Sequence, residues 1–170
     1  MTYLIVAIVV WSLIHFIPAG AAAFRAGLVR RIGAPVYRGI FAVVAFAALL
    51  LIISSWKSAS ATQLYAPPSW GLYLTVALNL AAFILLFAPY IRNSLSRHIR
   101  HPQLLGVVVW GVGHLFSNGE ARSIVLFGGF AIWAVLQIML LNRRDGVWIK
   151  PQPAPLLSNL RLLVTGLSFF

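Results

Sequence analysis

Long apolar runs separated by short polar connectors dominate this 170-residue chain and restrict what it can fold into. A run of about 20 apolar residues is long enough to cross the hydrocarbon core of a bilayer as a helix. Five such runs cover about residues 2–24, 39–56, 71–91, 103–117 and 123–141. A last apolar stretch, 158–170, is too short to cross, so we expect a half-helix there or a natural chain that continues further.

The composition requires that most of the protein surface face lipid. Hydrophobic residues make up 61% of the chain and charged residues only 9%, with a mean hydropathy of +0.94, whereas a soluble domain carries about 25% charged residues. The sequence therefore predicts an all-α fold, a polytopic transmembrane helix bundle with five full spans and a short sixth. We expect residues 1–170 to form a single integral membrane domain with membrane lipid as a partner.

The positive charge of the chain is concentrated in alternate connectors. The chain has 13 Lys and Arg against 2 Asp and Glu, a balance that would indicate nucleic-acid binding in a soluble protein. Here most basic residues lie in loops 25–38, 92–101 and 142–157, while the other two loops hold Lys57 alone or Arg122 with Glu120. Basic loops remain in the cytoplasm, so the N-terminus is predicted to lie outside and nucleic acid is not expected as a partner.

Helix-breaking residues mark the predicted ends of several spans. Pro67 and Pro68 end any helix before Trp70, and Pro102 suits the first position of the fourth span. Asn118–Gly119 is a turn signal, and Glu120 favours the first turn of the fifth span. A turn is the simpler interpretation of these last residues, although Asn118 and Glu120 could also orient a ligand or carry a proton.

Two histidines lie inside the apolar runs, where a polar side chain is costly and is a functional candidate. His15 is about twelve residues into the first span and His114 about eleven into the fourth, which enters from the opposite side. At 1.5 Å per residue, both are predicted in the middle third of the membrane, where two imidazoles could clamp a ligand. Gly106, Trp110 and Gly113 lie on roughly the same face as His114 and leave room for a flat group or a close helix.

The available side chains restrict what the two histidines could bind. The chain has no cysteine, and no carboxylate lies inside a span, so disulfides, thiolate sites and a mixed-ligand zinc site are excluded. Two imidazoles at mid-membrane suit the axial positions of a b-type haem, although copper is not excluded. The alternative interpretation is that each histidine packs helices together through hydrogen bonds. Gly128 and Gly129 in the fifth span likewise suit either ligand space or packing.

A second group of polar residues lies at the cytoplasmic boundary in the segment SRHIRHP. Arg100 and His101 could bind a haem propionate or a lipid phosphate, whereas His98 fits a solvated basic surface. Three polar residues inside or next to the spans could orient the two imidazoles by hydrogen bonding, on residue type alone: Ser12, Asn79 and Ser117.

Several segments of the chain are specific in combination: RHPQLLGVVVWGVGHLFSNGE, SIVLFGGFAIWAV, LYAPPSW, AFILLFAPY, LVRRIGAPVYRGIFAVVAF and IHFIPAG. Through them the chain resembles the NnrU family over about residues 10–145. That family is named for denitrification and nitric-oxide metabolism and is related to the plant zeta-carotene isomerase. The resemblance implies haem b as cofactor, with ligands at His15 and His114, and a bacterial inner-membrane location. It also implies either nitrogen-oxide redox chemistry or polyene cis–trans isomerisation. Relatives end in a complete final helix, whereas this chain ends at LSFF.

Two other function classes compete with a haem protein. The glycine-rich faces and near absence of carboxylates also suit a non-catalytic structural or assembly subunit of a larger membrane complex. The pattern RHPxxxG is also found in the cofactor-binding segment of membrane methyltransferases. Those enzymes need acidic residues, and the only two here, Glu120 and Asp145, are predicted on opposite sides of the membrane. A serine hydrolase is excluded because no Ser, His and carboxylate can be assembled on one side.

Overall fold

The computed structural model describes residues 1–170 and is entirely helical. Its helices are α1 (Thr2–Gly20), α2 (Ala22–Ile32), α3 (Ala34–Ser58), α4 (Gly71–Phe87), α5 (Pro102–Leu115), α6 (Ala121–Ser123), α7 (Gly129–Asp145) and α8 (Leu156–Ser168). Three short turns complete the set: η1 (Ala88–Tyr90), η2 (Leu95–Arg97) and the π-helical η3 (Ile124–Gly128). The only β pairing is an isolated bridge between Gln63 and Glu120. The predicted all-α class is confirmed.

Four helical segments are long and apolar enough to cross a membrane: Thr2–Gly20, Ala34–Ser58, Gly71–Tyr90 and Ala121–Asp145. They correspond to the first, second, third and fifth predicted spans. The fourth, predicted at 103–117, is the 14-residue helix α5, which reaches about 21 Å and is shorter than a typical span. The final stretch forms α8, a helix of 13 residues. These findings support a membrane protein.

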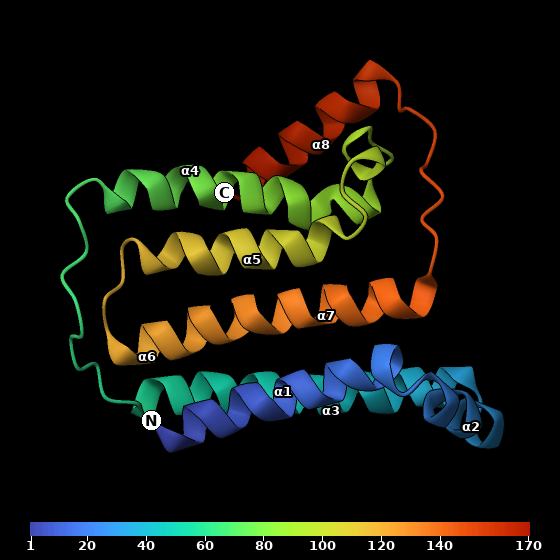
Figure 1. The fold of residues 1–170 in the computed structure, drawn as a ribbon, viewed down its shortest axis with the longest axis horizontal. Coiled ribbons are helices and arrows are strands. Elements are labelled where there is room, and N and C mark those ends of the chain that lie inside the picture. Colours follow the sequence, from blue (N-terminus) through green and yellow to red (C-terminus); the bar gives the residue numbers. More distant parts are fainter.

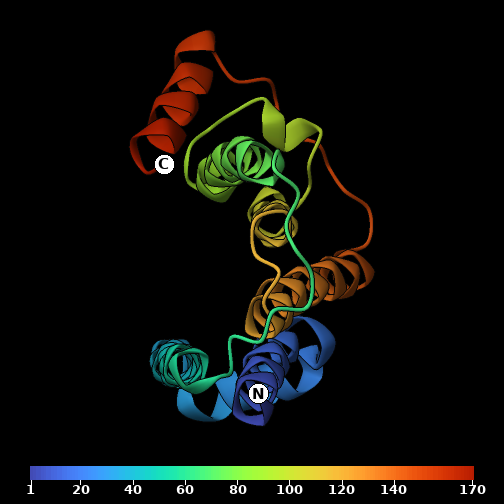
Figure 2. The same cartoon turned by 90° about the vertical axis from the view of Figure 1, so that its left-hand side faces the viewer.

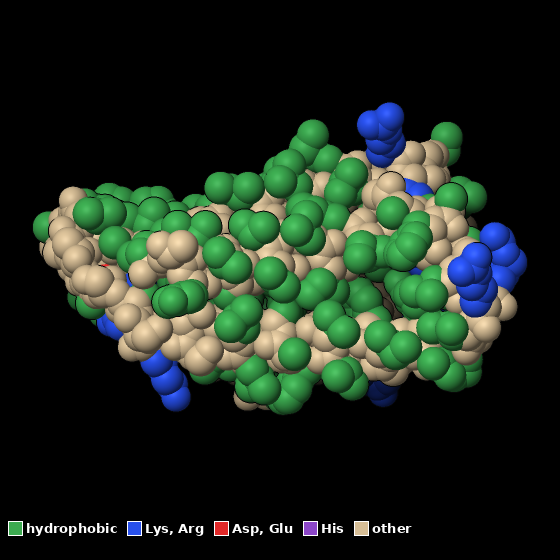
Figure 3. Space-filling view, turned by 90° about the horizontal axis from the view of Figure 1, so that it is seen from below, with side chains coloured by type: hydrophobic (Ala, Val, Ile, Leu, Met, Phe, Trp, Pro, Cys, Tyr) green, Lys and Arg blue, Asp and Glu red, His purple; other side chains and the backbone are tan.

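The helices lie side by side in one curved layer (Figures 1 and 2). The order across the layer is α8, α4, α5, α7, α1 and α3, and each neighbouring pair is in contact. Because a single layer covers little of itself, only 27 of the 170 residues are buried. The remaining apolar side chains require lipid around them. Figure 3 shows one face with hydrophobic side chains along its middle and Lys and Arg toward its ends.

The first basic connector is mostly helical, which the sequence interpretation missed. The first helix ends at Gly20, four residues earlier than predicted, and α2 then occupies most of loop 25–38. Ala, Leu and Arg are good helix formers, so the arginines there do not prevent a helix. Gly33, with φ of +81°, makes the bend between α2 and α3 that a residue with a side chain would rarely adopt.

The predicted helix breaks are confirmed. α4 begins at Gly71 after the two prolines, α5 begins at Pro102, and Glu120 directly precedes α6. The α6, η3 and α7 segments run on without a break, and η3 inserts one wide turn. After Asp145 the chain crosses to α8 without regular structure, within the predicted loop 142–157.

Candidate functional site

A groove of about 520 Å³ lies over α7 and is flanked by α1 and α5. Its walls are mostly apolar and aromatic, and it is lined by Trp11, His15, Leu86, Gln103, Leu104, Val107, Trp110, Phe130, Trp133, Gln137 and Leu141. We call this space the α7 groove. It falls in the size range of small-molecule and cofactor sites, which typically combine apolar walls with a few polar groups.

His15 projects from α1 into an aromatic environment at this groove. Its ring stacks on Trp11, with centroids 4.0 Å apart, and meets Phe41 and Trp133 edge-on at 5.4 Å. Its Nδ1 lies 2.8 Å from the backbone oxygen of Trp11. A carbonyl can only accept, so Nδ1–H donates and Nε2 carries the lone pair. Metal-binding histidines commonly have this arrangement.

His114 has the same local geometry on α5. Its Nδ1–H donates to the backbone oxygen of Trp110 at 2.9 Å, which again leaves Nε2 with the lone pair. Both histidines therefore follow the pattern Trp-x-x-x-His within a helix, with the tautomer fixed by the carbonyl of the tryptophan. Trp110 was selected from the sequence because it shares a helix face with His114. Trp11 was not selected, although it precedes His15 by the same four residues.

The structure does not bring the two histidines to one site. His114 stacks on Phe127 at 4.3 Å and is not among the residues that line the α7 groove. His15 contacts Trp133, which follows Phe127 by six residues, or about 9 Å along α7. His114 falls in the last turn of the short helix α5, so the two imidazoles do not lie side by side in this structure. Phe130 lies between Trp11 and Trp110, with centroids 5.7 and 6.1 Å away, and fills the space between the two helices.

Three buried polar atoms at the groove lack a hydrogen-bond partner: Trp11 Nε1, Trp133 Nε1 and Gln137 Oε1. Unpaired buried groups of this kind are rare in native structures and often indicate a missing ligand or water. Gln137 is only 8% exposed and, like Trp133, was not selected from the sequence. A glutamine inside the apolar run GFAIWAVLQIMLL was the available signal.

The residues proposed to orient the imidazoles have other roles. The Ser12 hydroxyl donates to the Ile8 carbonyl at 2.7 Å, and the Ser117 hydroxyl contacts the His114 carbonyl at 3.4 Å. The side-chain oxygen of Asn79 is buried without a partner. None of the three contacts a ring nitrogen, because the tryptophan carbonyls already hold both rings.

Most of the glycines considered as ligand space are packing positions. A Cβ on Gly106 would lie 3.0 Å from the Ala82 oxygen, and one on Gly113 would lie 3.0 Å from the Leu78 Cβ. These glycines allow α5 to approach α4 closely. Gly129 similarly packs on Ile8 of α1, whereas a Cβ on Gly128 would meet nothing within 4 Å.

Arg100 and His101 tie the start of α5 to the end of α7. An Arg100 Nη donates to the Gly146 oxygen at 2.8 Å, and His101 Nε2 lies 3.1 Å from the side-chain oxygen of Asn142. Neither residue lines the α7 groove. His98 is exposed, as a solvated basic surface would require.

At the opposite end, residues 117–120 form a well-connected turn. The Asn118 amide donates to the His114 oxygen at 2.9 Å, and Glu120 forms a 2.7 Å ion pair with Arg122. The Tyr65 hydroxyl donates to the backbone oxygens of Leu115 and Asn118. These contacts support the turn interpretation of this segment.

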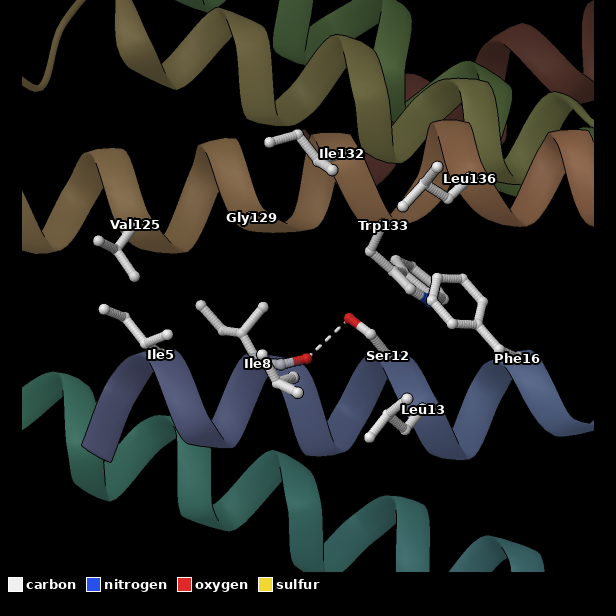
Figure 4. A pocket seen from close by; sticks show the side chains of 11 residues that line it. Ile5, Ile8, Ser12, Leu13, Phe16, Val125, Gly129, Ile132, Trp133 and Leu136 are labelled. Atoms are coloured by element: carbon white, nitrogen blue, oxygen red, sulfur yellow. Dashed lines mark hydrogen bonds between the residues drawn. The ribbon is translucent and has the colours of Figure 1, made fainter. Parts of the chain in front are cut away.

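A second groove, of about 350 Å³, lies between α1 and α7 (Figure 4). Its lining is mostly apolar, and the hydroxyl of its one serine, Ser12, is already bonded to Ile8. Trp133 borders both grooves. The second groove therefore offers no histidine and no free hydroxyl, and chemistry is better supported at the α7 groove.

No three His, Cys, Asp or Glu side chains come together as a metal site. Any metal held here would need ligands beyond the protein side chains, as the ring nitrogens of a haem provide. The α7 groove fits such a group through one imidazole, aromatic walls and unpaired polar atoms. It does not bring His114 to the same group in this conformation.

The fold is that of a helical membrane protein, and its α7 groove contains one histidine, His15. Over residues 3–170 the chain matches the family described as NnrU protein, which is nearly its whole length. The chain belongs to the NnrU family, as its sequence motifs indicated. No curated protein and no solved structure matched it.

Proposed function

We propose that this NnrU-family protein binds haem b in the α7 groove, with His15 Nε2 as an axial ligand. The observation that carries the proposal is the free Nε2 of His15, a residue that lines the α7 groove together with three residues whose buried polar atoms have no partners. Trp11, Trp110 and Trp133 would flank the flat group, and Gln137 offers it an amide. A bound haem would supply one-electron chemistry and an iron able to exchange ligands.

The second ligand is assigned to His114, whose Nε2 is also free. For both imidazoles to serve one iron, the helices that carry them must shift relative to each other, because His114 packs against Trp110 and Phe127 and does not line the groove. Such a rearrangement would accompany haem binding. The proposed role is redox chemistry linked to nitrogen oxides, or polyene cis–trans isomerisation, both as implied by the family.

We also infer how the chain is placed in the membrane. α5 begins beside the end of α4 and ends near the start of α6, at the opposite end of the layer (Figure 1). It therefore crosses the membrane as a short span, the fourth in chain order. The basic segments 25–38, 92–101 and 142–157 face the cytoplasm, and the N-terminus lies outside the inner membrane. Residues 1–170 act as one membrane unit.

The test is an absorption spectrum, oxidised and dithionite-reduced, of protein purified from cells supplied with haem. The proposal predicts b-type bands in the wild type and their loss in His15→Ala. His98→Ala is the matched control, because that histidine is exposed and outside the groove. A featureless wild-type spectrum would instead favour a non-catalytic subunit of a membrane complex.

A further inference from the structure

A cluster of arginines surrounds a cavity that the proposed haem site does not use. The cavity, of about 560 Å³, lies where α2 folds back toward the start of α3. It is lined by Arg25, Ala26, Val29, Arg30, Ala34, Tyr37 and Arg38. We call it the α2 cavity. Three arginines thus contribute to the lining of one hollow together with a single tyrosine.

These three arginines have no counter-ion within the protein. The chain has only two carboxylates, and each is already paired elsewhere: Glu120 with Arg122, and Asp145 with Arg144. Like charges in one cavity repel each other unless an anion joins them. All three arginines are exposed, and no carboxylate side chain of the protein competes with an external anion for them.

The hydrogen-bond donors of the cavity are almost all unused. Each guanidinium carries five N–H donors, yet the only protein bond among the three is from Arg38 Nε to the Ala34 oxygen at 3.3 Å. The Arg25 guanidinium lies 5.7 Å from the centre of the Tyr37 ring, which holds α2 against α3. Such an array of planar donors suits an anion with several oxygens, of which phosphate is the best match.

The location of the cavity indicates which phosphate it would meet. α1 ends at Gly20 and α3 begins at Ala34, and both are ends of candidate spans. The α2 cavity therefore lies at the level of the lipid headgroups.

We propose that the α2 cavity binds the phosphate group of an anionic phospholipid, through Arg25, Arg30 and Arg38. Arg31 provides a sharp comparison, since it neighbours Arg30 but lines a different hollow with Phe24, Gly27 and Leu28. If these arginines formed only a diffuse basic surface, replacing Arg30 or Arg31 should weaken lipid binding equally. If the α2 cavity is a defined site, only the replacement of Arg30 should weaken it.

The experiment measures lipid retained by the detergent-solubilised full chain, by native mass spectrometry during titration with phosphatidylglycerol. Arg30→Gln, Arg25→Gln and Arg38→Gln should each weaken binding about five-fold, a usual effect of one basic residue near an anionic lipid. Arg31→Gln should bind as the wild type does. Arg30→Lys keeps the charge, so it should bind the lipid better than Arg30→Gln does. This comparison separates a lost charge from a folding defect in Arg30→Gln.

Two further arms identify the source of the phosphate. Phosphatidylcholine, which carries no net charge, should bind more weakly than phosphatidylglycerol, and inorganic phosphate should displace the lipid only at far higher concentration. Equal losses in Arg30→Gln and Arg31→Gln would overturn the site. Equal binding of phosphatidylcholine and phosphatidylglycerol would overturn the assignment to an anionic lipid. So would inorganic phosphate that displaces bound phosphatidylglycerol at the concentrations at which the lipid itself binds.

Discussion

Gly111 on α5 is a position where an added methyl group should damage the packing between α5 and the η3–α7 segment. A Cβ there would lie 2.6 Å from the backbone oxygen of Phe127 and 3.2 Å from the Cβ of Ala131. The optimum for nonbonded carbon contacts is about 3.5 Å or more, and a backbone oxygen cannot rotate aside. Gly111→Ala therefore has to push α5 away from α7 by roughly 0.5–1 Å.

The energetic cost follows from this displacement. Overpacking a close contact typically costs about 1–3 kcal/mol, while the glycine-to-alanine change itself favours a helix by at most ~1 kcal/mol. We expect Gly111→Ala to lower the free energy of unfolding by about 1–2 kcal/mol. Gly128→Ala is the matched control, because nothing lies within 4 Å of its Cβ position. It should be neutral or slightly stabilising.

The assay is reversible unfolding in mixed micelles, in which the denaturing detergent is titrated and helix content is followed by circular dichroism. The comparison is between two alanines introduced into neighbouring helices of the same layer. Equal stability of the two variants would refute the close approach of α5 and α7 at Gly111. It would also put the position of the α7 groove in doubt, since α5 forms one wall.

Other contacts give predictions of the same kind. Thr75→Val should cost about 1 kcal/mol in the same unfolding assay, because the buried hydroxyl donates to the Gly113 oxygen at 2.7 Å and links α4 to α5; an unchanged midpoint would remove that link. Asn93→Ala should cost about 1–3 kcal/mol and speed proteolysis near η2, because its buried amide binds the Ala88 oxygen at 2.6 Å and its carbonyl accepts from Ser96. Cleavage at the wild-type rate would contradict this.

The sequence was most informative where local chemistry decides the structure. The helix starts at Gly71 and Pro102 and the turn before Ala121 follow from proline, glycine and capping preferences that act within a few residues. The apolar runs follow from the absence of water in the bilayer, which requires each backbone group to bond within its own helix. These effects do not depend on which helices become neighbours.

The lateral arrangement could not be predicted in the same way. Lipid-facing and partner-facing surfaces of a membrane helix are both apolar, so hydropathy does not reveal that α7 lies between α1 and α5. The levels of His15 and His114 depend on that arrangement and on the shortness of α5. Basic residues were interpreted as a connector, yet α2 forms there because arginine is compatible with a helix.

The candidate site was predicted in part. His15 and Trp110 both line the α7 groove, and the structure adds Trp11, Trp133 and Gln137 to them. Trp133 was missed because a tryptophan in an apolar run has no distinctive spacing of its own, whereas Trp11 and Gln137 carried signals in the interval to His15 and in a polar side chain within an apolar run. Their role becomes apparent only in the structure, where residues with unpaired buried atoms lie together around the α7 groove.

The most direct test of the account is the haem content and spin state of three proteins prepared in parallel with adequate haem. The account predicts one haem per chain with low-spin spectra in the wild type and no haem in His15→Ala. In His114→Ala it predicts retained haem that has become high-spin, because one axial ligand is lost while His15 still holds the iron. Haem retained in His15→Ala, or absent from the wild type, would contradict the assignment of the α7 groove.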